Sequence, residues 1–282
     1  NSLYPSVIRA LNMGPETVVG QLRQTMTENS IKQLMDAKKS FADAWEGQFG
    51  SKEYLAVMAM ERGTEITIDW ENGDEDTCSA YDVWRLIFDS NQPWTLSANG
   101  TIFTYEKKGI IPGLLEQWYA ERKVLQKNAK DSQGVDNDQF VYWDKRQLVK
   151  KINLNSLYGA ILNPGCRFFD KRIGQSTTLT GRSIAKHMSA KCNELLTEEY
   201  DHVGKCVIYG DTDSVYFSAW PVIKEQVGSG AMKWGKDECI ALYDQLGEAV
   251  NETYPAFMEK AHHCPRHLGE IIASGREIVA TK

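Results

Sequence analysis

The segment from Cys206 to Phe217 constrains the fold more than any other part of the chain. Two β-prone apolar runs flank a tight turn, and that turn carries Asp211 and Asp213. The pattern predicts a β-hairpin with hard oxygen ligands at its tip. Such ligands suit Mg²⁺, which coordinates carboxylate and phosphate oxygens. Because Asp, Thr, Gly and Ser are also ordinary turn residues, the segment alone fits a plain structural turn equally well.

Two further segments favour the functional interpretation. The chain begins Asn-Ser-Leu-Tyr-Pro-Ser-Val-Ile, and residues 151–159 read Lys-Ile-Asn-Leu-Asn-Ser-Leu-Tyr-Gly. With Tyr-Gly-Asp-Thr-Asp-Ser at 209–214, they resemble, in order, motif A (DxxSLYPSII), motif B (KxxxNSxYG) and motif C (YxDTDS) of family B DNA polymerases. Residues 14–17 and 98–112 are most similar to the replicative polymerases of T-even-type tailed phages. The resemblance covers essentially the whole chain, with weaker support over 20–95 and 219–265.

The chain departs from the family pattern at motif A. The family places an Asp three residues before the motif A Ser, and that position falls before Asn1. The resemblance therefore implies that only half of the family's metal-ligand pair lies in these residues. We expect a palm and fingers fragment without N-terminal, exonuclease and thumb domains, whether as one part of a split polymerase or as a partial reading frame.

Composition and cysteine usage narrow the class of protein. Of 282 residues, 42% are apolar and 25% are charged, as in a globular domain. No run of eighteen apolar residues occurs, so we expect no membrane span. The six cysteines are scattered without a CxxC pair, which favours reduced intracellular thiols over a disulfide framework.

Charge is distributed unevenly along the chain. The net charge of −6 is unusual for a nucleic-acid enzyme, since phosphate contacts need Lys and Arg. Residues 106–172, however, hold 13 Lys and Arg against 8 Asp and Glu. A basic insert therefore interrupts an acidic body, and the alternative is a solvated face with no binding role.

Hydrophobic periodicity and turn residues outline the elements. Pro5 favours a strand-turn-helix entry over residues 1–20, with Tyr4 outside helical dihedrals. Residues 236–260 are expected to be helical and 268–281 to have strand character. Further helices are expected at 31–47, 51–62, 80–89, 112–130, 138–161 and 177–199, a strand at 65–70, and hairpin turns at 71–74 and 99–100.

The resemblance implies an α+β fold. It consists of a family B polymerase palm, an antiparallel sheet with packed helices, interrupted by an α-helical two-helix fingers insertion. We expect the first palm part at residues 1–107, the fingers at 108–165 and the second palm part at 166–282.

The resemblance also implies roles for three carboxylates. Asp213 corresponds to the shared ligand of two Mg²⁺ ions, for which Mn²⁺ can substitute, and Asp211 tunes the site. Glu277 resembles an additional palm carboxylate near the metals. The alternatives are a turn-capping role for Asp213 and an exposed strand position for Glu277.

Cations of the predicted fingers helices are candidates for triphosphate binding. Lys151 and Asn155 are four residues apart and share a helix face. Arg122 resembles the first cation of the family's RKxxxK clamp, whereas Gln126 stands where the second is expected. Lys127 is the substitute candidate, and a solvated Lys-rich face is the alternative. By resemblance, the backbone amides of Ser2, Leu3 and Tyr4 also hold phosphate oxygens.

Tyr4, Tyr158 and Gly159 are the candidates for reading the sugar and the nascent base pair. The resemblance implies that the Tyr4 ring stacks beneath the sugar and clashes with a 2′-hydroxyl, which favours deoxynucleotides. Tyr158 and Gly159 continue the Lys151 helix face toward the base pair, where a glycine permits close approach. The alternative for Tyr4 is a buried aromatic beside a proline turn.

The resemblance implies a DNA polymerase whose partners are a primer-template, deoxynucleoside triphosphates and an upstream polymerase segment. A sliding clamp is implied through a further C-terminal part, and the setting is the host cytoplasm during phage infection. Two rival hypotheses are a catalytically silent module that binds nucleotide or a partner chain, and a polymerase that uses or makes RNA. The His262–His267 run supplies too few well-spaced ligands to favour zinc.

Overall fold

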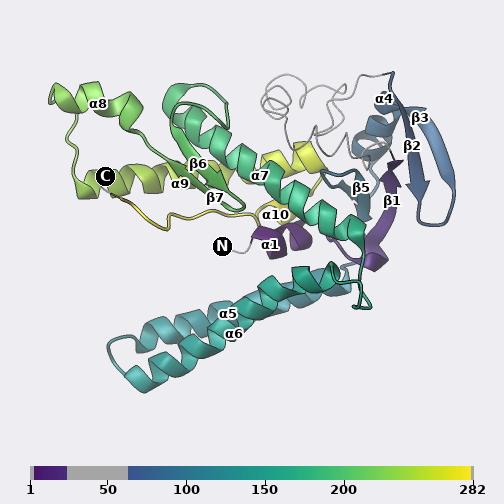
Figure 1. Ribbon diagram of the computed structural model, residues 1–282, viewed down its shortest axis with the longest axis horizontal. Helices are drawn as coiled ribbons and strands as arrows, with labels where there is room; N and C mark the ends of the chain where they lie inside the picture. The colour runs from purple at the N-terminus through teal and green to yellow at the C-terminus, as the bar shows by residue number, and fades with distance from the viewer. Residues whose placement is uncertain (1–2, 24–62, 281–282) are drawn as a thin grey trace.

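The computed structural model describes residues 3–23 and 63–280 and shows an α+β fold (Figure 1). A five-stranded antiparallel sheet and a separate β-hairpin combine with long helices. In chain order the elements are α1 (Leu3–Ala10), the 3₁₀ turn η1 (Pro15–Thr17), β1 (Val18–Leu22), β2 (Glu65–Trp70), β3 (Glu75–Ser79), α4 (Ala80–Trp84), the π-helical turn η5 (Arg85–Asp89), β4 (Trp94–Leu96), β5 (Thr101–Thr104), α5 (Ile110–Ser132), α6 (Asn137–Ile161), α7 (Lys171–Thr197), β6 (Val207–Asp211), β7 (Ser214–Phe217), α8 (Trp220–Gly228), α9 (Lys236–His262) and α10 (Arg266–Gly269).

The N-terminal segment corrects the expected strand-turn-helix order. Helix α1 comes first, and β1 follows after η1. Pro5 lies in the first turn of α1, where a backbone N–H has no intrahelical acceptor, so the proline does not break the helix. Val7 and Ile8 are buried on the inner face of the helix, which anchors α1 in the core.

The five strands pair in the order β3-β2-β1-β5-β4. The predicted turns are present, one between β2 and β3 and the other between β4 and β5. Gly73 and Gly100 adopt φ values of 92° and 79°, a region that glycine enters without steric cost. Helix α4 and η5 cover the sheet and form a second apolar core, with buried residues Leu22, Ile66, Ile68, Ala80, Val83, Ile87, Leu96 and Ile102.

The main core lies between α1, α7 and α9, where His187 of α7 is fully buried. Its ring stacks on Phe257, with centroids 4.1 Å apart. Its Nδ1 lies 2.6 Å from the Tyr200 hydroxyl and its Nε2 lies 2.8 Å from the Thr253 hydroxyl. Because Thr253 donates to the Val250 carbonyl, it accepts from Nε2. A neutral ring with the proton on Nε2 satisfies both contacts.

Burial of this imidazole predicts that acid destabilises the fold. Desolvation lowers the pKa of His187 from 6.5 to about 3. As the pH falls, the unfolded chain therefore takes up this proton before the folded chain does. The free energy of unfolding keeps its full value above pH 6.5 and decreases as the pH drops toward 3. The expected loss for this residue is about 2 kcal/mol by pH 5.

Urea unfolding between pH 7 and pH 5 measures this loss. His187→Gln should be less stable at pH 7 but should show a flatter pH dependence than the unaltered chain. His267→Gln, at an exposed histidine, should leave the dependence unchanged. An identical slope in the unaltered chain and in His187→Gln would count against the account.

Helices α5 and α6 form an antiparallel hairpin of 23 and 25 residues that projects from the rest of the molecule (Figure 1). Both predicted helices are confirmed. The side chain of Asp136 caps α6 by accepting bonds from Asp138 N and Gln139 N. Pro112 occupies the first turn of α5, as the sequence predicts.

The C-terminal segment corrects a second expectation. Residues 272–280 form neither helix nor strand in the described part of the chain. The side chain of Asn251 explains this difference, because it takes the place of a neighbouring strand. Its Nδ2 donates to Ser274 O at 2.9 Å, and its Oδ1 accepts from Ser274 N at 2.8 Å. The helices expected at 31–47 and 51–62 lie outside the described residues.

Within the described ranges, no helix is long and apolar enough to cross a membrane.

Candidate active site

The β6–β7 hairpin presents two carboxylates at its tip. Its register pairs Asp211 with Ser214 and Gly210 with Val215, which confirms the predicted hairpin. Asp211 ends β6 and Asp213 lies in the turn, and both are exposed. The Oδ1 atom of Asp211 accepts from Thr212 N at 2.7 Å and from Thr212 Oγ1 at 3.1 Å. This local bonding fixes Asp211, whereas the exposed Asp213 forms no ion pair or side-chain hydrogen bond within residues 3–23 and 63–280.

Tyr4 of α1 lies against both the α5–α6 hairpin and α7. Its ring contacts the Tyr158 ring, with centroids 4.7 Å apart and an interplanar angle of 43°. Gly181 of α7 permits the approach, because a Cβ there would lie 3.2 Å from Tyr4 Cε1 and 3.3 Å from Leu3 Cδ2. Segments far apart in the sequence therefore meet at one tyrosine.

The charges of the two carboxylates act on Tyr4. Burial raises the pKa of Tyr4, and the negative charges of Asp213 and then Asp211 raise it further. Burial also raises the pKa of Tyr158, with a further contribution from Tyr4. Both phenols stay protonated at neutral pH, so they act as contact surfaces and hydrogen-bond donors rather than as bases.

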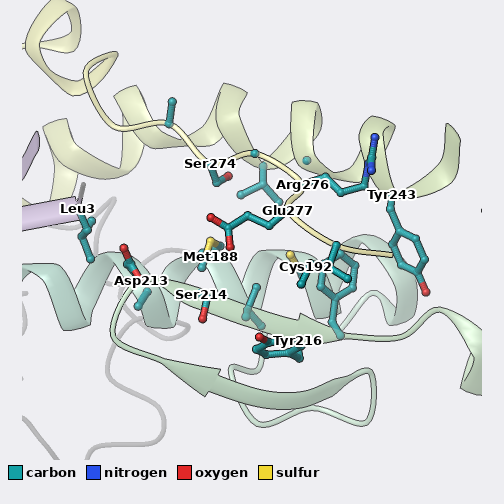
Figure 2. Close-up of a pocket in the computed structure, with 18 of the residues that line it drawn as sticks. Leu3, Met188, Cys192, Asp213, Ser214, Tyr216, Tyr243, Ser274, Arg276 and Glu277 are labelled. Carbon is teal, nitrogen blue, oxygen red and sulfur yellow. The ribbon is translucent and has the colours of Figure 1, made fainter. Parts of the chain in front are cut away.

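A cavity of about 520 Å³ lies beside the hairpin, between β7, α7, α9 and the C-terminal segment. Asp213, Glu277 and Leu3 all line it, which brings together three of the predicted site residues. Figure 2 shows Glu277 extending from the C-terminal segment into the space above β7. On the α7 side, the wall of the cavity is apolar and is formed by Ile184, Met188 and Cys192.

Sequence reasoning missed this apolar wall. Ile184, Met188 and Cys192 recur every four residues, so their helical period was visible. The period marks one face of a helix, but it cannot show that this face borders a cavity rather than a filled core. Burial raises the pKa of the Cys192 thiol to about 12, so this thiol is un-ionised and serves as an apolar wall.

The predicted triphosphate ligands lie on the α5–α6 hairpin with different exposures. Lys151, Asn155 and Lys127 are exposed. Arg122 is only 9% exposed, and its Nε donates to Gln147 Oε1 at 3.3 Å, so it lies between α5 and α6. Nothing lies within 4 Å of a Cβ built on Gly159, which leaves open space next to Tyr158. Ser2 lies outside the described residues.

Several neighbouring cations already have local contacts. Lys150 forms an ion pair with Glu121. The Lys123 ammonium lies 5.3 Å from the Tyr119 ring centroid, and the Arg146 guanidinium lies 4.8 Å from that of Tyr142. Lys151 forms no ion pair among the residues that the structure describes. Its ammonium, like that of the exposed Lys145, is therefore available to an anionic ligand.

The donor set at the hairpin tip is suited to Mg²⁺. Within residues 3–23 and 63–280, no three His, Cys, Asp or Glu side chains are close enough to hold a metal ion together. Mg²⁺ requires less from the protein, because it is commonly bound by one or two carboxylates together with substrate phosphates. Asp213 and Asp211 supply such a pair.

Comparison with known proteins identifies the family. The model of DNA polymerase family B matches residues 1–229. The DNA-directed DNA polymerase of Escherichia phage RB69 is 26% identical over 237 residues, which cover 82% of this chain and 25% of that protein. The corresponding enzyme of Enterobacteria phage T4 is 26% identical over 260 residues, covering 89% of this chain and 28% of that protein.

A solved family B DNA polymerase from the hyperthermophilic archaeon Pyrobaculum calidifontis is a more distant neighbour. It is 18% identical, with a TM-score of 0.44, and the match covers 82% of this chain and 22% of that chain. The chain spans about a quarter of the length of the phage relatives. The family match over most of the chain and the similarity to T-even phage enzymes confirm the resemblance seen in the motifs. This chain belongs to DNA polymerase family B.

Proposed function

We propose that this chain is the palm and fingers part of a phage DNA polymerase that adds deoxynucleotides to a primer 3′-hydroxyl under template direction. Residues 1–107 and 166–282 form the palm, and residues 108–165 form the fingers. The observation that carries the proposal is that Tyr4 contacts Tyr158, while its neighbour Leu3 lines the same cavity as Asp213. Motif A, motif B and motif C thus converge on one site. Such an enzyme works in the cytoplasm of the infected cell.

Asp213 and Asp211 are the carboxylates that would hold Mg²⁺ at this site. When bound, two such ions activate the primer hydroxyl and neutralise the leaving pyrophosphate, and Mn²⁺ can replace them. Asp213 would be the main carboxylate ligand, and Asp211, fixed by Thr212, would orient the turn. Glu277 adds negative charge across the same cavity.

The α5–α6 hairpin supplies the groups for the triphosphate and the base pair. Lys151 contacts the triphosphate as a point charge, and Asn155 lies on the same face of α6. Arg122 and Lys127 are further phosphate ligands on α5. Because Arg122 is buried against Gln147, it reaches a phosphate only after that bond is exchanged. The backbone amides of Ser2, Leu3 and Tyr4 complete the phosphate contacts.

The Tyr4 and Tyr158 rings form the surface under the incoming nucleotide. Tyr4 excludes a 2′-hydroxyl by steric contact, and Gly159 leaves space for the base pair. Because both phenols remain protonated, neither takes the proton of the primer hydroxyl. Their role is to shape the site and select the sugar.

A catalytically silent module is the second candidate. Such a module would bind nucleotide, or a partner polymerase chain, through the same hairpin. Primer extension by the assembled polymerase separates the two candidates, because the silent module leaves the primer unextended whatever chain accompanies it.

Calorimetric titration of the chain with a deoxynucleoside triphosphate and Mg²⁺ tests the nucleotide site. Lys151→Ala should weaken binding about tenfold, because it removes a charge that contacts phosphate. Lys150→Ala is the matched control. Its ammonium is already paired with Glu121, so its loss should change the affinity little. Equal affinities for the Lys151→Ala variant and the unaltered chain would contradict the assignment.

A further inference from the structure

A short connecting segment attaches the α5–α6 hairpin to the sheet. Residues 105–109 lead from the end of β5 into Ile110, the first residue of α5, and they form neither helix nor strand. Residues 106–108 are exposed. The direction in which α5 leaves the sheet therefore depends on how this segment is held.

Asn12 holds this segment through its side-chain amide. Nδ2 donates to Thr104 O and to Lys107 O, each at 2.8 Å, and Oδ1 accepts from Gly109 N at 2.9 Å. One side chain, 4% exposed, thus satisfies three backbone groups of the connection. Since a buried backbone group without a partner is costly, these bonds select one conformation of the segment.

The backbone of Asn12 is itself fixed. Its φ of 54° is in the left-handed region, which asparagine tolerates better than most residues. Its carbonyl accepts from Thr17 Oγ1 at 2.6 Å. From the same loop, Glu16 accepts the N–H of Ile110 at the start of α5. A Cβ on Gly109 would lie 3.1 Å from Thr17 Cγ2, so the connection packs directly on this loop.

Helix α1, which leads into Asn12, contacts both helices of the hairpin. The Arg9 guanidinium lies 4.9 Å from the Tyr119 ring centroid on α5. The Tyr4 ring lies 4.7 Å from that of Tyr158 on α6. The α5–α6 hairpin thus packs on α1 (Figure 1), and Asn12 bonds to the segment at its base.

We propose that Asn12 is a positioning residue that sets the angle of the α5–α6 hairpin, and so places Lys151 relative to Asp213. Its effect on nucleotide binding rests on the proposed function, whereas its effect on hairpin geometry does not. Asn12→Asp keeps the size of the side chain but cannot donate to the Thr104 and Lys107 carbonyls. Asn12→Gly retains the left-handed backbone at no steric cost and removes all three bonds.

Distance measurement between two spin labels tests the geometric effect. Val135→Cys at the hairpin tip, 84% exposed, and Lys224→Cys on α8 carry the labels. The partly exposed Cys78 and Cys166 are replaced by Ser. Asn91→Asp and Asn91→Gly are matched controls, because Asn91 is exposed and also adopts a left-handed φ, 56°, away from the hairpin.

We expect both Asn12 variants to broaden or shift the distance distribution and to weaken triphosphate binding about tenfold. The Asn91 variants should leave the distance distribution and the triphosphate affinity unchanged. An unchanged distribution in folded Asn12→Gly would overturn the proposal, and this variant decides the question if Asn12→Asp does not fold. Should the unaltered chain bind no triphosphate, the proposed function fails, while the distances still decide the role of Asn12.

Discussion

Asp213→Asn is expected to lower the rate of nucleotide addition by a factor on the order of 10³. The amide keeps the shape of the turn but removes the charge that Mg²⁺ requires at the tip of the β6–β7 hairpin. Single-turnover primer extension by the polymerase assembled with this chain measures the effect. The affinity for primer-template should stay close to normal, because Asp213 makes no duplex contact in the proposed site.

Asp237→Asn is the matched control for this prediction. Asp237 is an exposed carboxylate in the first turn of α9 and does not line the cavity. The same change of charge there should leave the rate within about twofold, a difference worth less than 0.5 kcal/mol. If Asp213→Asn is as active as Asp237→Asn, the assignment of the hairpin carboxylate is wrong.

Tyr4→Ala is expected to reduce discrimination against ribonucleotides about 100-fold. The ring contacts Tyr158 and lies within reach of the charge of Asp213, so its removal opens space where the 2′-hydroxyl is excluded. The ratio of kcat/KM for a deoxynucleotide and its ribonucleotide measures this effect. Tyr4→Phe keeps the ring and loses only the hydroxyl, so it should retain most of the discrimination.

The comparison of these two variants separates a steric role from a chemical one. Equal loss in Tyr4→Phe and Tyr4→Ala would assign the selection to the hydroxyl group. Strong ribonucleotide use by the unaltered enzyme would instead support the RNA-polymerase alternative. Retained discrimination in Tyr4→Ala would contradict the steric account altogether.

Local sequence patterns were enough to predict the elements that carry the site. The β6–β7 hairpin follows from two apolar runs around a turn, and α5 and α6 follow from helical period and turn residues. The predictions for the first 20 residues and for residues 268–281 were wrong, each for an identifiable reason. Pro5 is tolerated in a first helical turn, and Asn251 replaces the strand partner that residues 268–281 were expected to find.

The spatial relations of the site depend on contacts that no local pattern contains. The convergence of Asp213 and Glu277 on one cavity joins a hairpin to a distant segment. The burial of Arg122 against Gln147 depends on how α5 packs on α6. The role of Asn12 likewise requires segment 104–109 to lie beside it, which follows from the pairing of β1 with β5.

Single-nucleotide primer extension tests the central claim most directly. The polymerase assembled with this chain is given four primer-templates that differ in the first unpaired template base, each with one of the four deoxynucleotides and Mg²⁺. The account predicts extension by one nucleotide only where base and template are complementary, and none without the divalent ion. Extension that ignores the template, or an unextended primer in every combination while the chain still binds triphosphate, would contradict it.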